Sequence, residues 1–581
     1  MNLDKESTIG IAICIIGLFA WGHYNSQRPI ETEEQQTQQN TQNIVNEQQN
    51  STTKQVSTGN IKEKISAVIK PLEPVLKYTT QKNIIISNDL ESIEINPNTA
   101  SIQSVTLSDY LNSDKETNIT FGKDYKYDAL ELELSSEWQL TKVESIDSKT
   151  ENIAIVNRTF EKLLQGGAKQ KLTIEHKWTI ADLYKVEYEY KLLNQSQYPI
   201  NLKNSKISIG ALPSLQNLCG DETRMESHTV DYLLTENEEF ESVDYTKDSS
   251  SAKNANIKWV AIGNKFFVTL VYPTTILKGC EISDVKIIKD DEIEEIELKF
   301  NERAFSSKGK LADFNINPNE TKILNGILYA GPKKAKFIEQ INPEDSEVIK
   351  VMHFGWKLFG WIALKLSIFL NLIYFCIEYC LGAGNYYGVS IILLTVIIKG
   401  CFWPITNKAN ASMKKMQLVQ PKMKELREKH KDNPQLMNQK IMEFYKTEKI
   451  NPLGGCLPIL LQIPVFISLY WCLSGAIELR QVPFLWATDL TRPDIVATVF
   501  GLPIHPLVLL MTITMALQQQ LTPASDPMQK KVMMLMPIMM LFFFYGLPSG
   551  LTLYWTVSQI ISIIQLKINN KNNTTAIPAK A

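Results

Sequence analysis

The chain has 581 residues, of which 44% are hydrophobic, and a formal net charge of −2. This length exceeds what a single hydrophobic core usually serves, so more than one domain is expected. The near-zero total charge excludes a uniformly basic or acidic chain, and charge must be examined segment by segment. The eight cysteines show no CxxC or Cys/His ligand spacing, which argues against a zinc or redox site. Only Cys219 and Cys280 lie in the polar half, where a disulfide could form.

The N-terminal segment, residues 1–28, contains an apolar stretch at 8–24 that can enter a bilayer. We interpret it as an uncleaved anchor; a cleaved signal peptide, with Ala20 and Gly22 at its cleavage site, is the alternative. Residues 29–60 consist almost entirely of Gln, Asn, Thr, Ser and Glu. Such a segment cannot bury enough apolar surface to fold, and it is predicted to be a flexible tether.

Residues 61–345 show short runs of alternating polar and apolar residues, separated by Asn/Pro/Gly turn clusters, with hardly a helical window. This pattern predicts an antiparallel β-sandwich. The clearest runs are 102–107, 153–157, 171–178, 184–193, 257–272 and 295–300. His176 and His228 stand alone in this half and are interpreted as structural.

Residues 346–387 are predicted to form a linker and a helix that lies in the membrane interface. The stretch 352–381 is long and apolar, but its polar residues fall on one side of a helix, as in interfacial helices. These residues are Lys357, Lys365, Asn371 and Glu378.

Residues 388–566 are predicted to hold five membrane-spanning helices, because their apolar runs have the required length and composition. The candidates are 388–404, 453–475, 497–520, 532–547 and 549–566. With the N-terminal anchor they make six spans. A seventh would exist if 352–381 also crossed the bilayer.

Charge predicts the orientation of these spans. The segment 405–451 holds eleven Lys and Arg against five Asp and Glu, so it is expected on the cytoplasmic side. Both termini are then cytoplasmic, including the short tail 567–581, and residues 25–351 lie outside. Apolar spacing in 405–451 predicts a helical hairpin whose second arm starts at Asn433-Pro434. Two explanations of its basic character stay open: the positive charge only keeps the hairpin on the cytoplasmic side, or it provides a surface for ribosomal RNA or acidic lipid.

Lys399 lies inside a predicted span, where a lysine costs roughly 2.5–3.5 kcal/mol on insertion scales. It could extend its amine to the nearby membrane surface. Alternatively, it faces a hydrophilic pocket together with Thr395 and a polar stripe on the last span, formed by Thr552, Thr556 and Gln559. No acidic residue occurs within the five predicted spans to pair with it.

Three segments resemble the YidC family of membrane protein insertases: TVIIKGCFWPITNKANASMKKMQLVQPKMKELREK, EKINPLGGCLPILLQIPVFISLYWCLSGAIELR and DPMQKKVMMLMPIMMLFFFYGLPSGLTLYWTVSQ. The similarity runs over nearly all of 350–566. The order of anchor, tether, β domain, interfacial helix and five spans resembles the Gram-negative form. That form implies a polytopic helical protein with six transmembrane helices and a large periplasmic all-β supersandwich domain.

The resemblance implies a non-enzymatic insertase and chaperone of the bacterial inner membrane, without cofactor or metal. Its partners would be nascent membrane proteins, the ribosome (through 405–451), the Sec translocon and the lipid bilayer, and not DNA. In the family a cationic groove receives the substrate. Here its residues would be Lys399, Thr395, Trp555, Tyr554, Thr552, Thr556 and Gln559, and an apolar surface for the sliding substrate would comprise Met533, Met536, Met540 and Phe543.

Two departures from the family pattern matter. Lys399 stands where the family usually has arginine, so bidentate contacts are not expected. The short, weakly basic tail argues against a tail-mediated ribosome contact. The rival interpretations are a secondary transporter that uses the Lys399 pocket, and a carbohydrate-binding β-sandwich on a membrane anchor. Transporters usually carry internal repeats and acidic coupling residues, and neither is found in this sequence.

Overall fold

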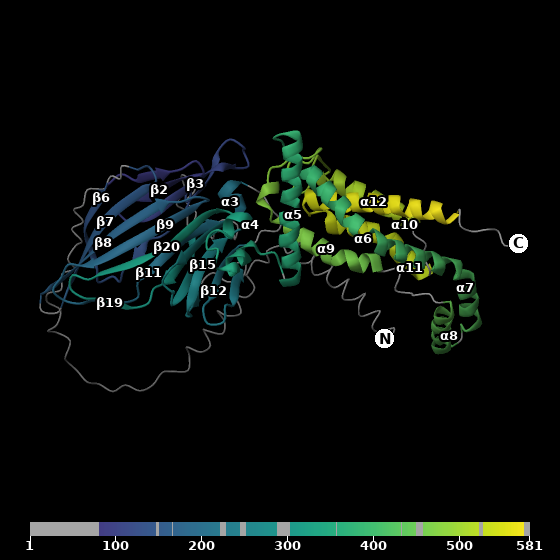
Figure 1. Cartoon of the computed structure of the whole chain (residues 1–581), viewed down its shortest axis with the longest axis horizontal. Helices are drawn as coiled ribbons and strands as arrows, with labels where there is room; N and C mark the ends of the chain where they lie inside the picture. The colour runs from purple at the N-terminus through teal and green to yellow at the C-terminus, as the bar shows by residue number, and fades with distance from the viewer. Residues whose placement is uncertain are drawn as a thin grey trace, which may run out of the picture. The chain divides into compact units, whose positions relative to one another are not determined.

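The structure is a computed structural model that describes residues 81–574, except 147–149, 165–166, 221–227, 245–250, 287–302, 356, 432, 449–456 and 522–526. The predicted anchor, tether and C-terminal tail beyond residue 574 lie outside the described residues. The remainder belongs to one compact unit, Thr80–Ala581. It comprises a β domain followed by apolar helices (Figure 1).

A nine-stranded antiparallel sheet forms the centre of the β domain. Its strands, in spatial order, are β13 (Phe240–Asp244), β12 (Thr229–Leu234), β15 (Ile257–Gly263), β16 (Phe267–Pro273), β20 (Thr321–Pro332), β9 (Lys185–Asn194), β8 (Lys169–Ile180), β7 (Ile153–Leu163) and β6 (Gln139–Ile146). Regular alternation of buried with half-buried or exposed residues in β7, β8 and β9 shows why these segments form strands with one face on a core.

Smaller sheets complete the domain. One has the order β14 (Ser251–Lys253), β17 (Gly279–Lys286), β18 (Arg303–Lys310), β11 (Lys206–Pro213) and β5 (Leu132–Glu133). Another is β1 (Ile84–Ser87), β2 (Glu91–Asn96), β3 (Ser101–Leu111) and β4 (Asn118–Phe121), and a pair is β10 (Ile200–Leu202) with β19 (Phe314–Ile316). Strand β11 packs against β15 and β16, so two sheets face each other as a sandwich.

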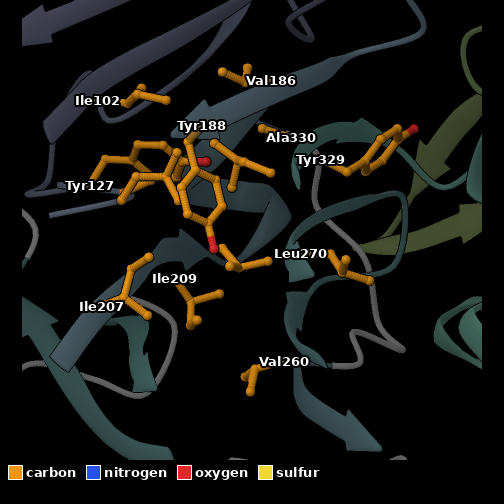
Figure 2. Close-up of a cluster of buried hydrophobic side chains, with 14 of the residues drawn as sticks. Ile102, Tyr127, Val186, Tyr188, Ile207, Ile209, Val260, Leu270, Tyr329 and Ala330 are labelled. Atoms are coloured by element: carbon orange, nitrogen blue, oxygen red, sulfur yellow. The ribbon is translucent and has the colours of Figure 1, made fainter. Parts of the chain in front are cut away.

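The core between these sheets contains large side chains from strands far apart in sequence. Figure 2 shows Tyr188 of β9, Ile209 of β11 and Leu270 of β16 converging there. Polar atoms in this core find partners: the Tyr190 hydroxyl donates to the Leu130 carbonyl at 2.6 Å. The predicted β-sandwich is therefore confirmed as a β-rich domain.

Most predicted strands are found, with one correction. The run 257–272 is two strands, β15 and β16, joined by a tight turn in which the Asn264 side chain accepts hydrogen bonds from the backbone amides of Phe266 and Phe267. An apolar run does not reveal such a turn, because both strands are buried. The run 295–300 lies outside the described residues. Cys219 and Cys280 are both free and buried, so the possible disulfide is absent.

Short helices and one long helix follow the β domain or lie within it. The short ones are α3 (Leu215–Cys219), α4 (Ala335–Ile338) and the 3₁₀ turn η2 (Ser346–Met352). The long helix α5 (Lys357–Leu381) confirms a helix in the segment predicted to lie in the interface, and it packs on α9 and α6; its place in the membrane stays a prediction. Its polar residues have different surroundings: Lys365 is exposed among apolar residues, whereas Asn371 accepts a hydrogen bond from Tyr387 of α6 at 3.0 Å.

Seven α-helices, one 3₁₀ turn and one β-hairpin follow α5 in the described chain. These are α6 (Tyr387–Leu418), α7 (Gln420–Lys429), α8 (Pro434–Thr447), α9 (Leu457–Ser474), η4 (Ile477–Leu479), α10 (Pro506–Leu521), α11 (Pro527–Phe544) and α12 (Ser549–Thr574), with the hairpin β21 (Ala497–Val499) and β22 (Leu502–Ile504) before α10. Figure 1 shows α6, α10 and α12 side by side, and α12 packs on α6, α9 and α10.

The prediction of a span over 497–520 was wrong at its N-terminal end. Residues 497–504 form the β21–β22 hairpin, and α10 starts only at Pro506. Gly501 allows a turn there, and the Pro506 ring favours the first position of a helix over an interior one. Apolarity alone does not separate a β-hairpin from the start of a span.

By length and composition, three helices of the described part could cross a membrane: Leu358–Leu381, Tyr387–Met416 and Ser549–Asn569. The apolar stretches of α9, α10 and α11 are shorter. The six-span count therefore stays a prediction.

Candidate functional site

Lys399 of α6 lies at the centre of a polar network between three apolar helices. Its Nζ donates to Gln462 Oε1 of α9 at 3.2 Å and to Ser562 Oγ of α12 at 3.0 Å. Both acceptors are neutral, and the ion pairs of the described residues include none with Lys399. The cation is thus held in place without being neutralised.

Gln462 extends the network to the last helix. While its carbonyl oxygen accepts from Lys399, its Nε2 donates to Tyr554 Oη at 2.7 Å and to Ser558 Oγ at 3.3 Å. This division of roles fixes the orientation of the amide. Ser562 Oγ in turn donates to the Ser558 carbonyl one turn back on α12.

A second polar group follows along α12 in the direction of its C-terminus. Gln565 Nε2 donates to Thr406 Oγ1 and Asn407 Oδ1, both at 2.7 Å, and Asn569 also donates to Asn407. Ser558, Ser562, Gln565 and Asn569 follow helical spacing, so they share one side of α12. Polar groups therefore line the contact between α6 and α12 from Lys399 onward.

The predicted groove residues are mostly buried near this network but are not all part of it. Thr395, Thr552 and Thr556 are at most 2% exposed, and each hydroxyl donates to the backbone carbonyl four residues earlier. Gln559 is 8% exposed. Tyr554 belongs to the network through Gln462, as described above.

Trp555 does not bind Lys399 in this structure. Its ring packs edge-on against Phe466, with centroids 5.0 Å apart, and tilted against Phe544 at 5.4 Å. Its Nε1 is buried and has no hydrogen-bond partner among the described residues. An indole N–H without a partner is available to a ligand that comes within reach.

The predicted apolar sliding surface on α11 is only partly exposed. Phe543 is 37% exposed, Met536 is half-buried and Met540 is 8% exposed, while the side chain of Met533 lies outside the described set. The exposed apolar face of α11 is formed by other residues of the same helix: Met534, Leu535, Ile538, Met539 and Phe542. An apolar surface is thus present, and it is rotated from the predicted one.

Sequence reasoning missed Gln462, Ser558, Ser562, Gln565 and Asn407. Gln462 could have been found, because it is the one amide in the apolar helix α9. The serines gave no signal, since hydroxyls occur commonly in apolar helices and usually bond to their own backbone. In the described part of the chain no group of His, Cys, Asp and Glu side chains could hold a metal ion.

The basic segment forms the predicted helical hairpin. The Asn433 side chain caps α8 by accepting from the Leu436 amide at 3.1 Å, with Pro434 at the first helical position, which confirms the predicted start. The first arm differs from the prediction: Met416 lies in the last turn of the long helix α6, whereas Met423 lies on α7, and both are buried. Lys422, Lys424 and Lys429 remain exposed on α7.

The two histidines of the β domain are buried. His176 is fully buried, stacked on Trp178 and in edge contact with Tyr190. His228 is 3% exposed and contacts the ring of Phe305. Burial in the aromatic core agrees with a structural role.

Comparison with known proteins matches both halves of the chain. The profile described as "60Kd inner membrane protein" covers residues 379–576, and the profile "YidC periplasmic domain" covers 83–367. Proteins named "Membrane protein insertase YidC" are similar over different lengths. The one from Francisella philomiragia is 30% identical over 96% of this chain and 96% of its own. The one from Pelobacter propionicus is 35% identical over 70% of this chain and 73% of its own.

The similarity to the protein of that name from Syntrophobacter fumaroxidans, 40% identical, covers 55% of each chain. The crystal structure titled "Active YidC insertase crystal structure with the first transmembrane domain resolved" shares 17% identity over 84% of this chain and 92% of that one, at a TM-score of 0.33. The sequence similarity over nearly the full Francisella protein is decisive. This chain belongs to the YidC family of membrane protein insertases.

Proposed function

We propose that this protein inserts other proteins into the bacterial inner membrane and helps them fold, alone or with the Sec translocon. The observation that supports this best is Lys399, a cation held by Gln462 and Ser562 between apolar helices. The relatives named as membrane protein insertases supply the reaction class.

The first step would be electrostatic. A cation in surroundings of low dielectric attracts an anion more strongly than one in water, and neutral partners leave that attraction available. The polar, often acidic, leading segment of a substrate would therefore enter between α6, α9 and α12 and exchange its water for Lys399 and the hydroxyl and amide groups beside it. Trp555, with its unpartnered Nε1, adds a donor on α12.

The second step would be partition of the substrate helix into lipid. The exposed apolar face of α11, which includes Met534, Ile538 and Phe542, offers a surface on which an apolar segment can slide. Methionine side chains adapt to many shapes, which suits a protein with varied substrates. The hydrophobic effect drives this step, so no nucleotide is required.

The proposed topology has six spans: the N-terminal anchor, α6, α9, α10, α11 and α12, with α5 in the interface. Both termini and the α7–α8 hairpin would be cytoplasmic, and residues 25–351 periplasmic. The exposed lysines of α7 would contact the ribosome during insertion. A tag at residue 200 that only cytoplasmic reagents reach would contradict this arrangement.

Substitution of Lys399 in reconstituted vesicles tests the function. Lys399→Ala is expected to impair insertion of small proteins whose translocated segment is acidic, and Lys399→Arg to retain it. A substrate with a neutral translocated segment is the matched control, since its insertion should change little. If the Ala variant inserted both substrates as well as the wild type does, the role of the cation would be refuted. Crosslinking from Thr395, Lys399 and Trp555 to a ribosome-stalled nascent chain would locate the substrate.

A further inference from the structure

The β21–β22 hairpin presents an apolar tip that no described residue covers. Phe500, at the tip, is fully exposed at 101%, and Leu502 and Val499 beside it are 67% and 46% exposed. Cross-strand pairing of Val499 with Leu502 and of Ala497 with Ile504 places these four residues on one face of the hairpin.

The turn at the tip adds backbone strain to this exposure. Phe500 has φ 51° and Gly501 has φ 80°, so both lie in the left-handed region that a two-residue hairpin turn of this type requires. Asn, Asp and Gly adopt that conformation readily, whereas a bulky side chain rarely does. An aromatic residue thus occupies a position that disfavours it both by backbone conformation and by exposure to water.

The hairpin is held firmly at its base. The Asp494 carboxylate accepts from Trp486 Nε1 at 2.9 Å and from the Leu507 amide at 2.6 Å, so it ties the segment before the hairpin to the first turn of α10. The Tyr545 hydroxyl donates to the Pro503 carbonyl at 2.6 Å. The tip therefore keeps a fixed position relative to α10 and α11.

Two features indicate that lipid covers the tip. No Asp, Glu, Lys or Arg occurs between Asp494 and Asp526, so the hairpin and α10 form one charge-free stretch, continuous with exposed Leu509, Ile513 and Leu517 of α10. In addition, α10 has 16 residues, or about 24 Å, which is less than the roughly 30 Å of a bilayer core. The hairpin lies just before the N-terminus of α10 and extends the apolar surface of this short helix at that end.

We propose that the β21–β22 hairpin inserts its tip, Phe500 with Val499 and Leu502, into the acyl-chain boundary of the bilayer. The proposed topology places the tip in the outer leaflet, and only this choice of leaflet depends on that topology. The insertion is shallow, because the unpaired edges of a two-stranded sheet cannot be satisfied in the hydrocarbon centre. The hairpin anchors the loop between α9 and α10 in the membrane surface.

Depth-dependent quenching tests this proposal. The full chain, with a fluorescent amino acid in place of Phe500, is reconstituted into phosphatidylethanolamine/phosphatidylglycerol vesicles whose acyl chains are brominated at carbons 6,7 or 11,12. We expect stronger quenching by the 6,7 bromines and little by aqueous iodide. The same probe at Ile513 should respond also to the 11,12 bromines, and at Tyr198, an exposed residue of the β domain, to iodide only.

The proposal would be overturned if iodide quenched the probe at position 500 as strongly as it quenches the probe at position 198. So would protection that disappears when the protein is diluted in lipid, since a second copy would then be the cover. With the probe moved to Leu502, Phe500→Asn should weaken quenching by lipid without loss of folding, because Asn suits the turn. The measurement needs no substrate, so its outcome is independent of whether the chain proves to be an insertase.

Discussion

At the scale of single residues, the central feature is a lysine with neutral partners inside an apolar helix group. A carboxylate at the position of Gln462 would form an ion pair and cancel the charge, whereas an amide oxygen orients the amine and leaves its charge to act on a substrate. Gln and Ser as partners distinguish this site from a structural ion pair, and under the proposed function the uncancelled charge would attract an anion.

Gln462→Glu is therefore expected to inhibit as strongly as Lys399→Ala. Loss of about 1–2 kcal/mol of attraction corresponds to a roughly 5–30-fold reduction in insertion of a substrate with an acidic leading segment. The double variant Lys399→Gln, Gln462→Lys, which moves the cation to α9, should restore part of the activity. Reconstituted insertion of one substrate across the three variants measures this, and a Glu variant with normal activity would contradict it.

A second buried ionisable group lies in the β domain. Glu91 of β2 is fully buried, and neither carboxylate oxygen has a hydrogen-bond partner among the described residues. Burial raises the pKa of Glu91 to about 8, from an ordinary value of 4.5. The folded protein therefore holds this proton between about pH 4.5 and 8, where the unfolded chain has lost it.

Because the folded state binds more protons in that range, stability should fall as pH rises from about 5 to 8, by on the order of a few kcal/mol. Glu91→Gln keeps the shape without the titration. We expect this variant to match the wild type near pH 5 and to be more stable at pH 8, measured as thermal unfolding of the full chain in detergent. If the unfolding temperatures of the two proteins changed in parallel with pH, Glu91 would not titrate in this way.

At the scale of elements, the α7–α8 hairpin combines a capped, packed structure with exposed cations. Its two arms pack on each other, and Met437, Ile441 and Phe444 of α8 are half-buried, whereas the lysines of α7 are exposed. Lys422 and Lys424 form only exposed ion pairs, with Glu448 at 3.5 Å and Glu428 at 3.9 Å, and such pairs contribute little to stability and can be exchanged for a partner.

Gln in place of Lys422, Lys424, Lys429 and Lys431 should weaken binding to ribosomes. The slope of log K against log salt should flatten by up to about 0.9 for each lysine that contacts phosphate. A matched control changes four exposed lysines of the β domain, Lys115, Lys123, Lys203 and Lys322. Sedimentation of ribosomes with vesicles at several salt concentrations gives the slopes. Equal losses in both variants would indicate a general charge effect.

At the scale of the whole molecule, the β domain touches the helical part through the loop that follows α9. Arg480 Nη1 donates to the Leu111 carbonyl at 2.7 Å, and Gln481 donates to the Asn112 carbonyl at 2.8 Å. Asp231 of β12 pairs with His353, 2.7 Å away, in the segment before α5. Burial by itself raises the pKa of Asp231, but His353, Lys333 and Ser242 together hold it below its ordinary value.

Deletion of residues 61–330 should leave insertion largely intact, since Lys399 and its partners all lie in the helical part. The deleted chain should melt at a lower temperature, because Arg480 and Gln481 lose their carbonyl partners. Insertion and thermal unfolding are measured on the same membranes. A deleted protein that is present in the membrane but inactive would contradict the assignment of function to the helices.

The sequence predicted well what periodicity and charge encode. The strands around β7 to β9 alternate regularly, and the Asn433 cap and the basic hairpin follow local rules, so all were found. Gln462 was not linked to Lys399, because they are 63 positions apart and only tertiary packing brings them together. The β21–β22 hairpin was taken for part of a span, since Val, Phe, Leu and Ile suit either structure.

Under the proposed function, the continuity of α6 would set a minimum length for incoming polypeptides. The helix runs without interruption from Tyr387 to Leu418, so the axial distance from Lys399 to its end beside α7 is about 29 Å. An extended chain covers that distance with about nine residues. A nascent chain held at the α7–α8 hairpin can bring an acidic residue to Lys399 only if that residue precedes the held segment by about nine positions or more. Substrates would thus be sorted by the spacing of their charges as well as by their sign.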